Sequence, residues 1–94
     1  MYVYAIVMYT HKRTYTNYTQ TQWTDRYYIN GHLDYEEDWL DGKVHGHARK
    51  YDLETGMIMS EMLYVSGVLH GKVMHYTHGR LIAASEWRDG RAHV

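Results

Sequence analysis

In residues 31–46 the chain reads GHLDYEEDWLDGKVHG, and the same pattern returns at residues 56–71 and, in part, at residues 79–94. Each copy opens on a glycine, has Trp or Tyr eight residues later and a second glycine three residues after that. The leading glycines are 25 and then 23 residues apart, so residues 28–94 hold three units of one repeat. The residues that define the repeat are Gly31, Trp39, Gly42, His45, Gly46, Tyr51, Gly56, Tyr64, Gly67, His70, Gly71, Tyr76, Gly79, Trp87 and Gly90.

The residues between these glycines alternate in a way that favours β-strands. Side chains of a strand point to opposite faces with period two, so Leu33, Tyr35, Glu37 and Trp39 share one face. We interpret the Gly-x-x-His-Gly element as a turn, in which glycine allows positive φ or a close backbone approach. Each unit is then a β-hairpin, and stacked hairpins extend one sheet. The predicted fold is all-β: a single twisted antiparallel sheet, a β-meander of about six to eight strands.

Residues 1–27 follow the repeat only faintly and are interpreted as an atypical N-terminal capping hairpin of the same domain, which spans residues 1–94. Residues 2–9 predict one strand, and residues 14–24, rich in threonine and aromatic residues, predict the other. His11, Lys12 and Arg13 are the predicted turn between them. No 3.6-residue periodicity predicts a helix.

The pattern Gly-x-Leu-x-x-Glu-x-x-Tyr/Trp-x-x-Gly-x-x-His-Gly-x-x-x-x-Tyr resembles the bacterial MORN-variant repeat of YwqK-type candidate antitoxins. The resemblance covers roughly residues 28–94 and implies a β-hairpin repeat fold with an antitoxin-like role. The chain departs from the family in its small number of copies. It also has Val94 where the repeat has glycine and Ala84 where the other units have glutamate.

The histidines invite a metal site, since His45 and His47 would share a strand face. However, His45, His70 and His93 occupy one repeat position, which a structural role at the turn explains. Equivalent positions two strands apart are separated by roughly 10 Å, whereas zinc needs each nitrogen within about 2.1 Å. We therefore predict no metal and no cofactor.

Two other groups of residues are candidates for binding a partner. A single sheet cannot bury both faces, so aromatic side chains outside the repeat stay exposed, and Tyr and Trp are common interface hot spots. The acidic run at residues 34–41 would suit a basic groove, although it also fits a solvated strand face or protection against aggregation. The candidate partner-binding residues are Tyr15, Tyr18, Trp23, Tyr27, Asp34, Glu36 and Asp38.

Composition narrows the function classes. The formal net charge of −1 gives no general attraction to nucleic acid or anionic membranes. The absence of cysteine excludes disulfides and thiol chemistry and is compatible with the cytoplasm, where we expect the protein. The apolar residues 1–9 are too short to span a bilayer and lack the features of a signal peptide. No phosphate loop, serine elbow or His-Glu-x-x-His motif is present, so we do not predict an enzyme.

The sequence thus predicts an interaction module that binds and neutralises another protein or protein complex. An antitoxin and a phage or mobile-element inhibitor of a host defence complex, for example one that targets nucleic acid, fit this description equally. One alternative is a structural or membrane-associated scaffold of the MORN type, and another is a small metal-dependent enzyme. Open sheet edges without proline also predict a homodimer.

Overall fold

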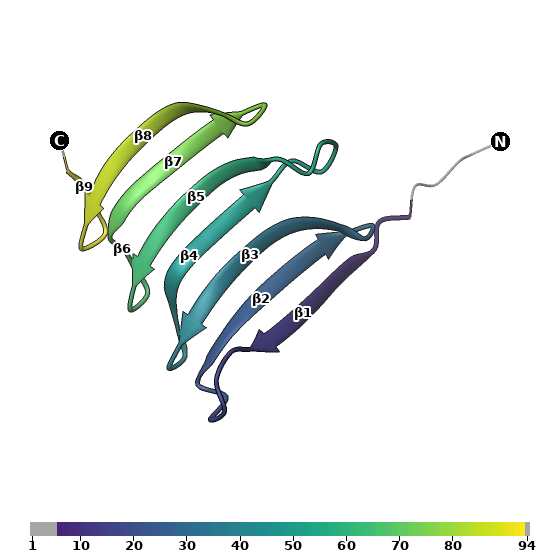
Figure 1. Cartoon of the computed structure of the whole chain (residues 1–94), viewed down its shortest axis with the longest axis horizontal. Coiled ribbons are helices and arrows are strands. Elements are labelled where there is room, and N and C mark those ends of the chain that lie inside the picture. Colours follow the sequence, from purple (N-terminus) through teal and green to yellow (C-terminus); the bar gives the residue numbers. More distant parts are fainter. Residues whose placement is uncertain (1–5, 94) are drawn as a thin grey trace.

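The computed structural model describes residues 6–93, which form one antiparallel sheet and contain no helix (Figure 1). The strands are β1 (Tyr9–Tyr15), β2 (Gln22–Ile29), β3 (His32–Leu40), β4 (Lys43–Tyr51), β5 (Ile58–Val65), β6 (Val68–Leu69), β7 (Gly71–Thr77), β8 (Arg80–Arg88) and β9 (Arg91–His93). They lie side by side in chain order, and β6 and β7 are two parts of one strand interrupted at His70. The predicted all-β antiparallel meander is confirmed.

Two-residue turns join most of these strands, and the repeat glycine ends each turn. In the turn between β3 and β4, Asp41 has a φ of 51° and Gly42 a φ of 79°. Positive φ at both central residues is the type I′ geometry, whose twist matches that of the flanking strands. The turns of this kind are Asn30-Gly31, Asp41-Gly42, Ser66-Gly67, His78-Gly79 and Asp89-Gly90.

The prediction that Gly42 and Gly46 bound a single turn is wrong, although both have positive φ. Gly46 lies inside β4, at a bulge where the pairing of β3 with β4 shifts register. A Cβ on Gly46 would meet the Asp38 carboxylate at 3.2 Å. That carboxylate accepts the backbone N–H of His47 at 3.2 Å and the hydroxyl of Thr24 at 2.9 Å. Glycine therefore makes room for the side chain that closes the bulge.

The repeat histidine links one hairpin end to the next. His45 accepts the backbone N–H of Ser66 on its Nδ1 atom at 3.1 Å. Beside it, the N–H of Gly67 donates to the carbonyl of Val44 at 2.7 Å. These bonds hold the turn of the second unit against the strand of the first, which is a structural role for this position.

The N-terminal hairpin differs from the prediction. His11, Lys12 and Arg13 are not a turn but the middle of β1, because their alternation continues the strand. The connection to β2 is instead residues 16–21, where Asn17 Oδ1 accepts the N–H groups of Thr21 and Gln22 at 3.0 Å each. Of the predicted strand at residues 2–9, residues 2–5 lie outside the described residues and residues 6–8 are not in a strand.

The sheet is a single layer with both faces open to solvent. The structure is 20 Å across in its shortest dimension. Within residues 6–93, Ala48 and Val73 are the only buried apolar side chains, and Asp25 is the only buried charged one. No helix in this part of the chain is long and apolar enough to cross a membrane. Contacts between neighbouring strands must therefore supply the stability that a core supplies elsewhere.

Changing Gly46 to alanine tests the bulge. The positive φ and the Asp38 contact together should lower the free energy of unfolding by at least about 2 kcal/mol, measured by urea denaturation. Gly56→Ala is the matched control, because Gly56 has a φ of 74° but nothing within 4 Å of the added Cβ. It should cost about 1 kcal/mol from the backbone alone. Equal losses in the two variants would contradict the proposed crowding at the bulge.

Candidate interaction face

The aromatic rings that contact one another lie on one face of β1, β2 and β3. Tyr15 pairs with Trp23, and Trp23 pairs with Trp39, so the three rings form a row across the strands. Tyr27 pairs with Tyr35 four residues further along the same strands. We call this surface the aromatic face, and it consists of Tyr15, Trp23, Tyr27, Tyr35 and Trp39 with the carboxylates of Asp25 and Glu37 between them.

The rings of the aromatic face touch one another rather than a second layer. Trp23 and Trp39 stack with centroids 5.9 Å apart and planes 11° from parallel. Tyr15 packs edge-on against Trp23 at 5.9 Å, and Tyr27 lies 6.1 Å from Tyr35. Such arrangements suit the quadrupoles of aromatic rings. Because Tyr15 stays 44% exposed and Tyr27 36% exposed, the face offers aromatic area to a partner.

Asp25, at the centre of this face, is 1% exposed and fully satisfied. Arg13 donates from Nε at 2.8 Å and from Nη2 at 3.0 Å, His11 Nε2 lies at 2.9 Å, and Trp23 donates from Nε1 at 3.3 Å. Burial by itself raises the pKa of Asp25, but the bonds and charges of Arg13 and His11 outweigh it and leave the pKa below its usual value. His11 also stacks on Tyr27 at 4.7 Å. Through these contacts the side chains of β1 bind β2.

Glu37 lies opposite Asp25 on the next strand but has a different environment. It accepts the hydroxyl of Tyr35 at 3.1 Å and the indole N–H of Trp39 at 3.0 Å. Among residues 6–93, no Lys, Arg or His forms an ion pair with it. Burial and then the charge of Glu37 raise the pKa of Tyr35 well above its usual value, so Tyr35 stays a donor.

The candidate residue Glu36 lies on the opposite face, in a row of alternating charges that we call the charge ladder. Arg26 Nε reaches Glu36 at 3.1 Å, Arg49 reaches it at 3.5 Å, and Arg49 Nε reaches Glu61 at 2.6 Å. The ladder crosses β2 to β5. The hydroxyl of Tyr51 also donates to Glu36 at 2.6 Å, and burial followed by this bond raises the pKa of Tyr51 to about 12. Glu36 is thus occupied by internal partners.

Beyond Glu61 the same row continues as Met74 on β7 and Ala84 on β8. Met74 occupies the repeat position of Arg49, and Ala84 occupies that of Glu61. The charged pair between the first and second units is therefore replaced by an apolar pair between the second and third units. This explains why the third unit lacks the repeat glutamate.

The remaining candidates are also apart from the aromatic face. Asp34 forms an ion pair with Lys50 at 2.5 Å, and Asp38 closes the bulge at Gly46. Tyr18 is fully exposed in the connection between β1 and β2. Of the seven predicted residues, the structure thus brings three together, namely Tyr15, Trp23 and Tyr27.

Several residues that form or adjoin this face are not among the seven candidates. They are His11, Arg13, Asp25, Tyr35, Glu37 and Trp39. A signal was present, because a carboxylate lies two residues from a tryptophan in both Trp23-x-Asp25 and Glu37-x-Trp39. That spacing puts both side chains on one strand face.

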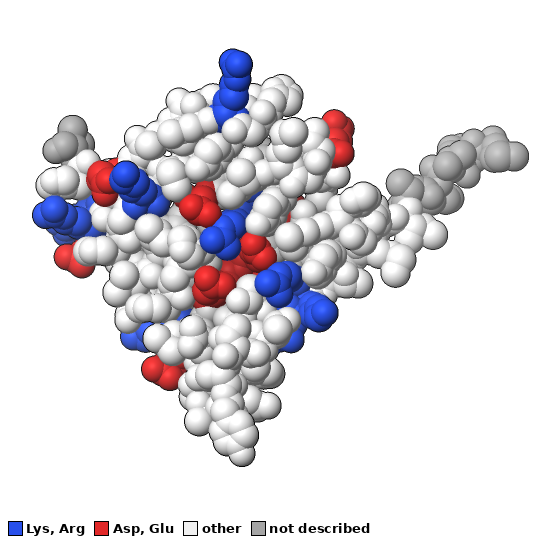
Figure 2. Space-filling model, viewed as in Figure 1, with Lys and Arg blue, Asp and Glu red and all other residues white. Residues whose placement is uncertain are grey.

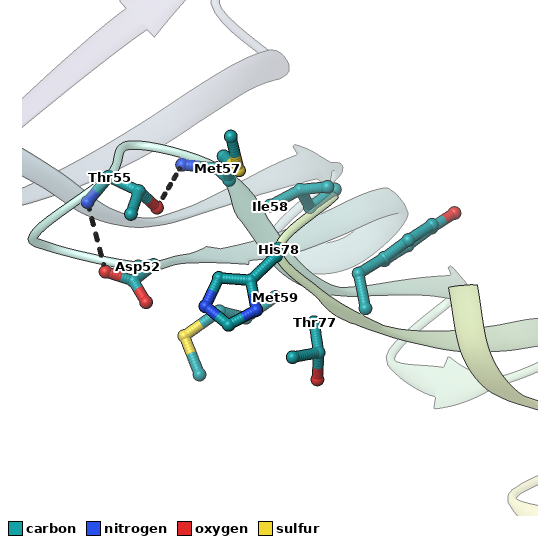
Figure 3. A pocket seen from close by; sticks show the side chains of 8 residues that line it. Asp52, Thr55, Met57, Ile58, Met59, Thr77 and His78 are labelled. Atoms are coloured by element: carbon teal, nitrogen blue, oxygen red, sulfur yellow. Dashed lines mark hydrogen bonds between the residues drawn. The ribbon is translucent and has the colours of Figure 1, made fainter. Parts of the chain in front are cut away.

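A separate pocket of about 110 Å³ lies at the end of β5, where the connection of residues 52–57 meets the turn at His78 (Figure 3). The Asp52 carboxylate in its lining stabilises the connection itself, since Asp52 Oδ1 accepts the N–H groups of Glu54 at 2.8 Å and Thr55 at 3.2 Å. Within the described part of the chain, no group of three His, Asp or Glu residues could hold a metal ion. The pocket therefore lies where two connections of the sheet meet.

Charge is mixed over the sheet. In Figure 2, acidic and basic side chains are interspersed over the middle of the face in view, without a large area of one sign. The chain matches no family model, no curated protein and no solved structure.

The Asp25 cluster predicts that Arg13→Ala destabilises the fold. Removing the arginine leaves a buried carboxylate short of donors and should cost about 1–3 kcal/mol of unfolding free energy. Lys12→Ala, on the other face of β1, is the control and should change stability by less than about 0.5 kcal/mol. Chemical denaturation with tryptophan fluorescence as the readout would measure both.

The same variant has a predicted pH dependence. Because the folded pKa of Asp25 is lowered, its stabilisation is present above the unfolded pKa of about 4 and is lost as pH falls through the folded pKa. Denaturation curves of the wild type and Arg13→Ala should therefore differ at pH 7 and converge at the acid end. A difference that persists unchanged at pH 2–3 would show that Arg13 acts through packing alone.

The charge ladder predicts coupling between Arg49 and Glu61. Arg49→Met leaves Glu61 without its cation, and Glu61→Ala leaves Arg49 with only its longer contact to Glu36. The double variant reproduces the Met74 and Ala84 pair, so its loss of stability should be smaller than the sum of the single losses by about 1 kcal/mol. Strict additivity in a thermal or urea denaturation cycle would contradict a paired replacement.

Proposed function

We propose that this chain is an interaction module that binds and neutralises another protein or protein complex through its aromatic face. The observation that supports this is the stacked, part-exposed row of Tyr15, Trp23 and Trp39 beside Tyr27 and Tyr35. Tyrosine and tryptophan dominate the energetic centres of protein interfaces. Rigid rings also lose little conformational entropy when they bind.

Neighbouring groups hold this surface in one shape. Arg13 lies over the Trp23 ring at 4.5 Å while it binds Asp25, and Trp39 donates its indole N–H to Glu37. The rings are therefore fixed before a partner arrives, and preorganisation of this kind lowers the free-energy cost of association.

Within this class we favour an antitoxin-like or anti-defence inhibitor, for which the repeat resemblance and the small size argue. The mixed charges of the sheet favour a protein partner over direct contact with nucleic acid or membrane. A chain without cysteine needs no oxidising compartment, and we propose that it acts in the cytoplasm.

The open sheet edges support the proposal of a homodimer. β9 pairs with residues 86–88 of β8, so residues 80–85 have no strand partner on that side within residues 6–93. Leu81 and Ile82 in this segment are 55% and 64% exposed. An unpaired strand edge of this kind can accept a strand from a second copy, and light scattering after size-exclusion chromatography would give the oligomeric state.

The main test compares surfaces of the chain in partner capture. The immobilised wild-type protein should retain a host protein at 1:1 stoichiometry, and the Tyr15→Ala/Tyr27→Ala variant should bind the isolated partner about tenfold more weakly or worse. Tyr18→Ala is the matched control, since it removes an exposed tyrosine that lies off the aromatic face. Circular dichroism would verify that each variant is folded.

Two results would contradict the proposal. If the double variant bound as well as the wild type, the aromatic face would not be the docking surface. If Tyr18→Ala alone abolished binding, the connection between β1 and β2 would be the contact instead.

A further inference from the structure

Two strands of the aromatic face carry the same pair of side chains. Trp23 donates its indole N–H to Asp25 at 3.3 Å, and Trp39 donates its own to Glu37 at 3.0 Å. In each pair the two residues are two positions apart on one strand, and the pairs face each other in register across β2 and β3. We call each pair a tryptophan–carboxylate unit.

The unit on β2 holds an arginine from the chain itself. Arg13 lies opposite Asp25 in the register of β1 and β2. Its guanidinium group lies 4.5 Å from the centre of the Trp23 ring and donates two hydrogen bonds to the Asp25 carboxylate. Stacking on an indole and forked bonding to a carboxylate are the two features for which arginine is suited.

In the described part of the chain, the unit on β3 has no such cation. The residue opposite Glu37 on β4 is Ala48, which brings no charge. Across residues 6–93, the donors to Glu37 are the neutral groups of Tyr35 and Trp39, one to each carboxylate oxygen. A carboxylate has about four acceptor positions, so Glu37 can accept a further bond at each oxygen.

The fold does not require a charge at this position. The second unit of the repeat has Met62 in place of Glu37, and the third has Ser85. Ser85 accepts the indole N–H of Trp87 at 2.9 Å, so a neutral side chain is enough to orient the tryptophan. Of the three repeat units, the first therefore has a negative charge at this position, on β3 beside the aromatic face.

We propose that Glu37 and Trp39 bind an arginine side chain of the protein partner, in the way that Asp25 and Trp23 bind Arg13. This proposal rests on the proposed function, because it names the partner group that the aromatic face receives. Arginine fits better than lysine, since a planar guanidinium stacks on the indole while it bonds the carboxylate. Tyr35 and Trp39 hold the carboxylate in place for it.

The test needs no protein partner, only Nα-acetyl-arginine amide as the probe. The indole N–H resonance of Trp39, assigned from a Trp39→Phe variant, should shift and saturate with a dissociation constant on the order of millimolar. Nα-acetyl-citrulline amide has the same shape without the charge and should give no saturable shift. The whole chain is used throughout.

Variants of the carboxylate complete the test. Glu37→Ser copies the arrangement of Ser85 and Trp87, so the tryptophan keeps an acceptor while the charge is lost. It should weaken arginine binding by at least about tenfold, as expected for the loss of a charge-assisted hydrogen bond, and Glu37→Gln should behave alike. Glu86→Gln, an exposed glutamate on β8, is the control and should bind as the wild type does.

The proposal is overturned if the wild type shows no saturable shift, if citrulline amide matches arginine amide, or if Glu37→Ser binds undiminished. These results would leave the aromatic face intact as a docking surface, because partner capture is measured separately. Conversely, a failure of Tyr15→Ala/Tyr27→Ala to weaken capture would remove the docking surface without changing the titration.

Discussion

A single layer of strands has no second layer to pack against, so each side chain is stabilised by its neighbours on adjacent strands. The cross-strand pair is then the unit of stability, and this sheet uses stacked rings on one face and the charge ladder on the other. Both depend on register, because a slip of one residue would exchange the faces. Two-residue turns such as Asp41-Gly42 and the bulge at Gly46 fix that register. The glycine positions are therefore what the rest of the structure depends on.

The same constraint explains how the units differ. Arg49 and Glu61 become Met74 and Ala84 together, so each row across the sheet stays compatible with its neighbours. At the bulges, Asp38 over Gly46 becomes Leu63 over Gly71, and each glycine again makes room for a different side chain. The units therefore share which positions pair across the strands. The side chain at one position can change from charged to apolar when the side chain opposite it changes as well.

The meander and its period could be predicted from the sequence because glycine spacing and alternation are local properties. The partners of the acidic run could not, because Arg26 and Arg49 reach Glu36 only once three strands are in register. Polar composition at residues 11–13 suggested a turn, but Asn17 stabilises the true connection through bonds that composition does not reveal. The repeat pattern identifies Trp39, but not that in a single layer it stacks on Trp23 and remains part-exposed.

The aromatic face is confined to the end of the sheet where the repeat meets the N-terminal hairpin. That hairpin supplies Tyr15, Trp23 and Tyr27, which extend the row of rings beyond Tyr35 and Trp39. Further along the same face the strands carry Ala48 and Val73 together with Tyr64 and Trp87, and within residues 6–93 these two rings form no stacked pair. The outer strand of this hairpin, β1, pairs with β2 alone, so its side chains have to match one neighbouring strand and not two. Under the proposed function, the hairpin and β3 of the first repeat unit together form the recognition surface, and the remaining strands support it.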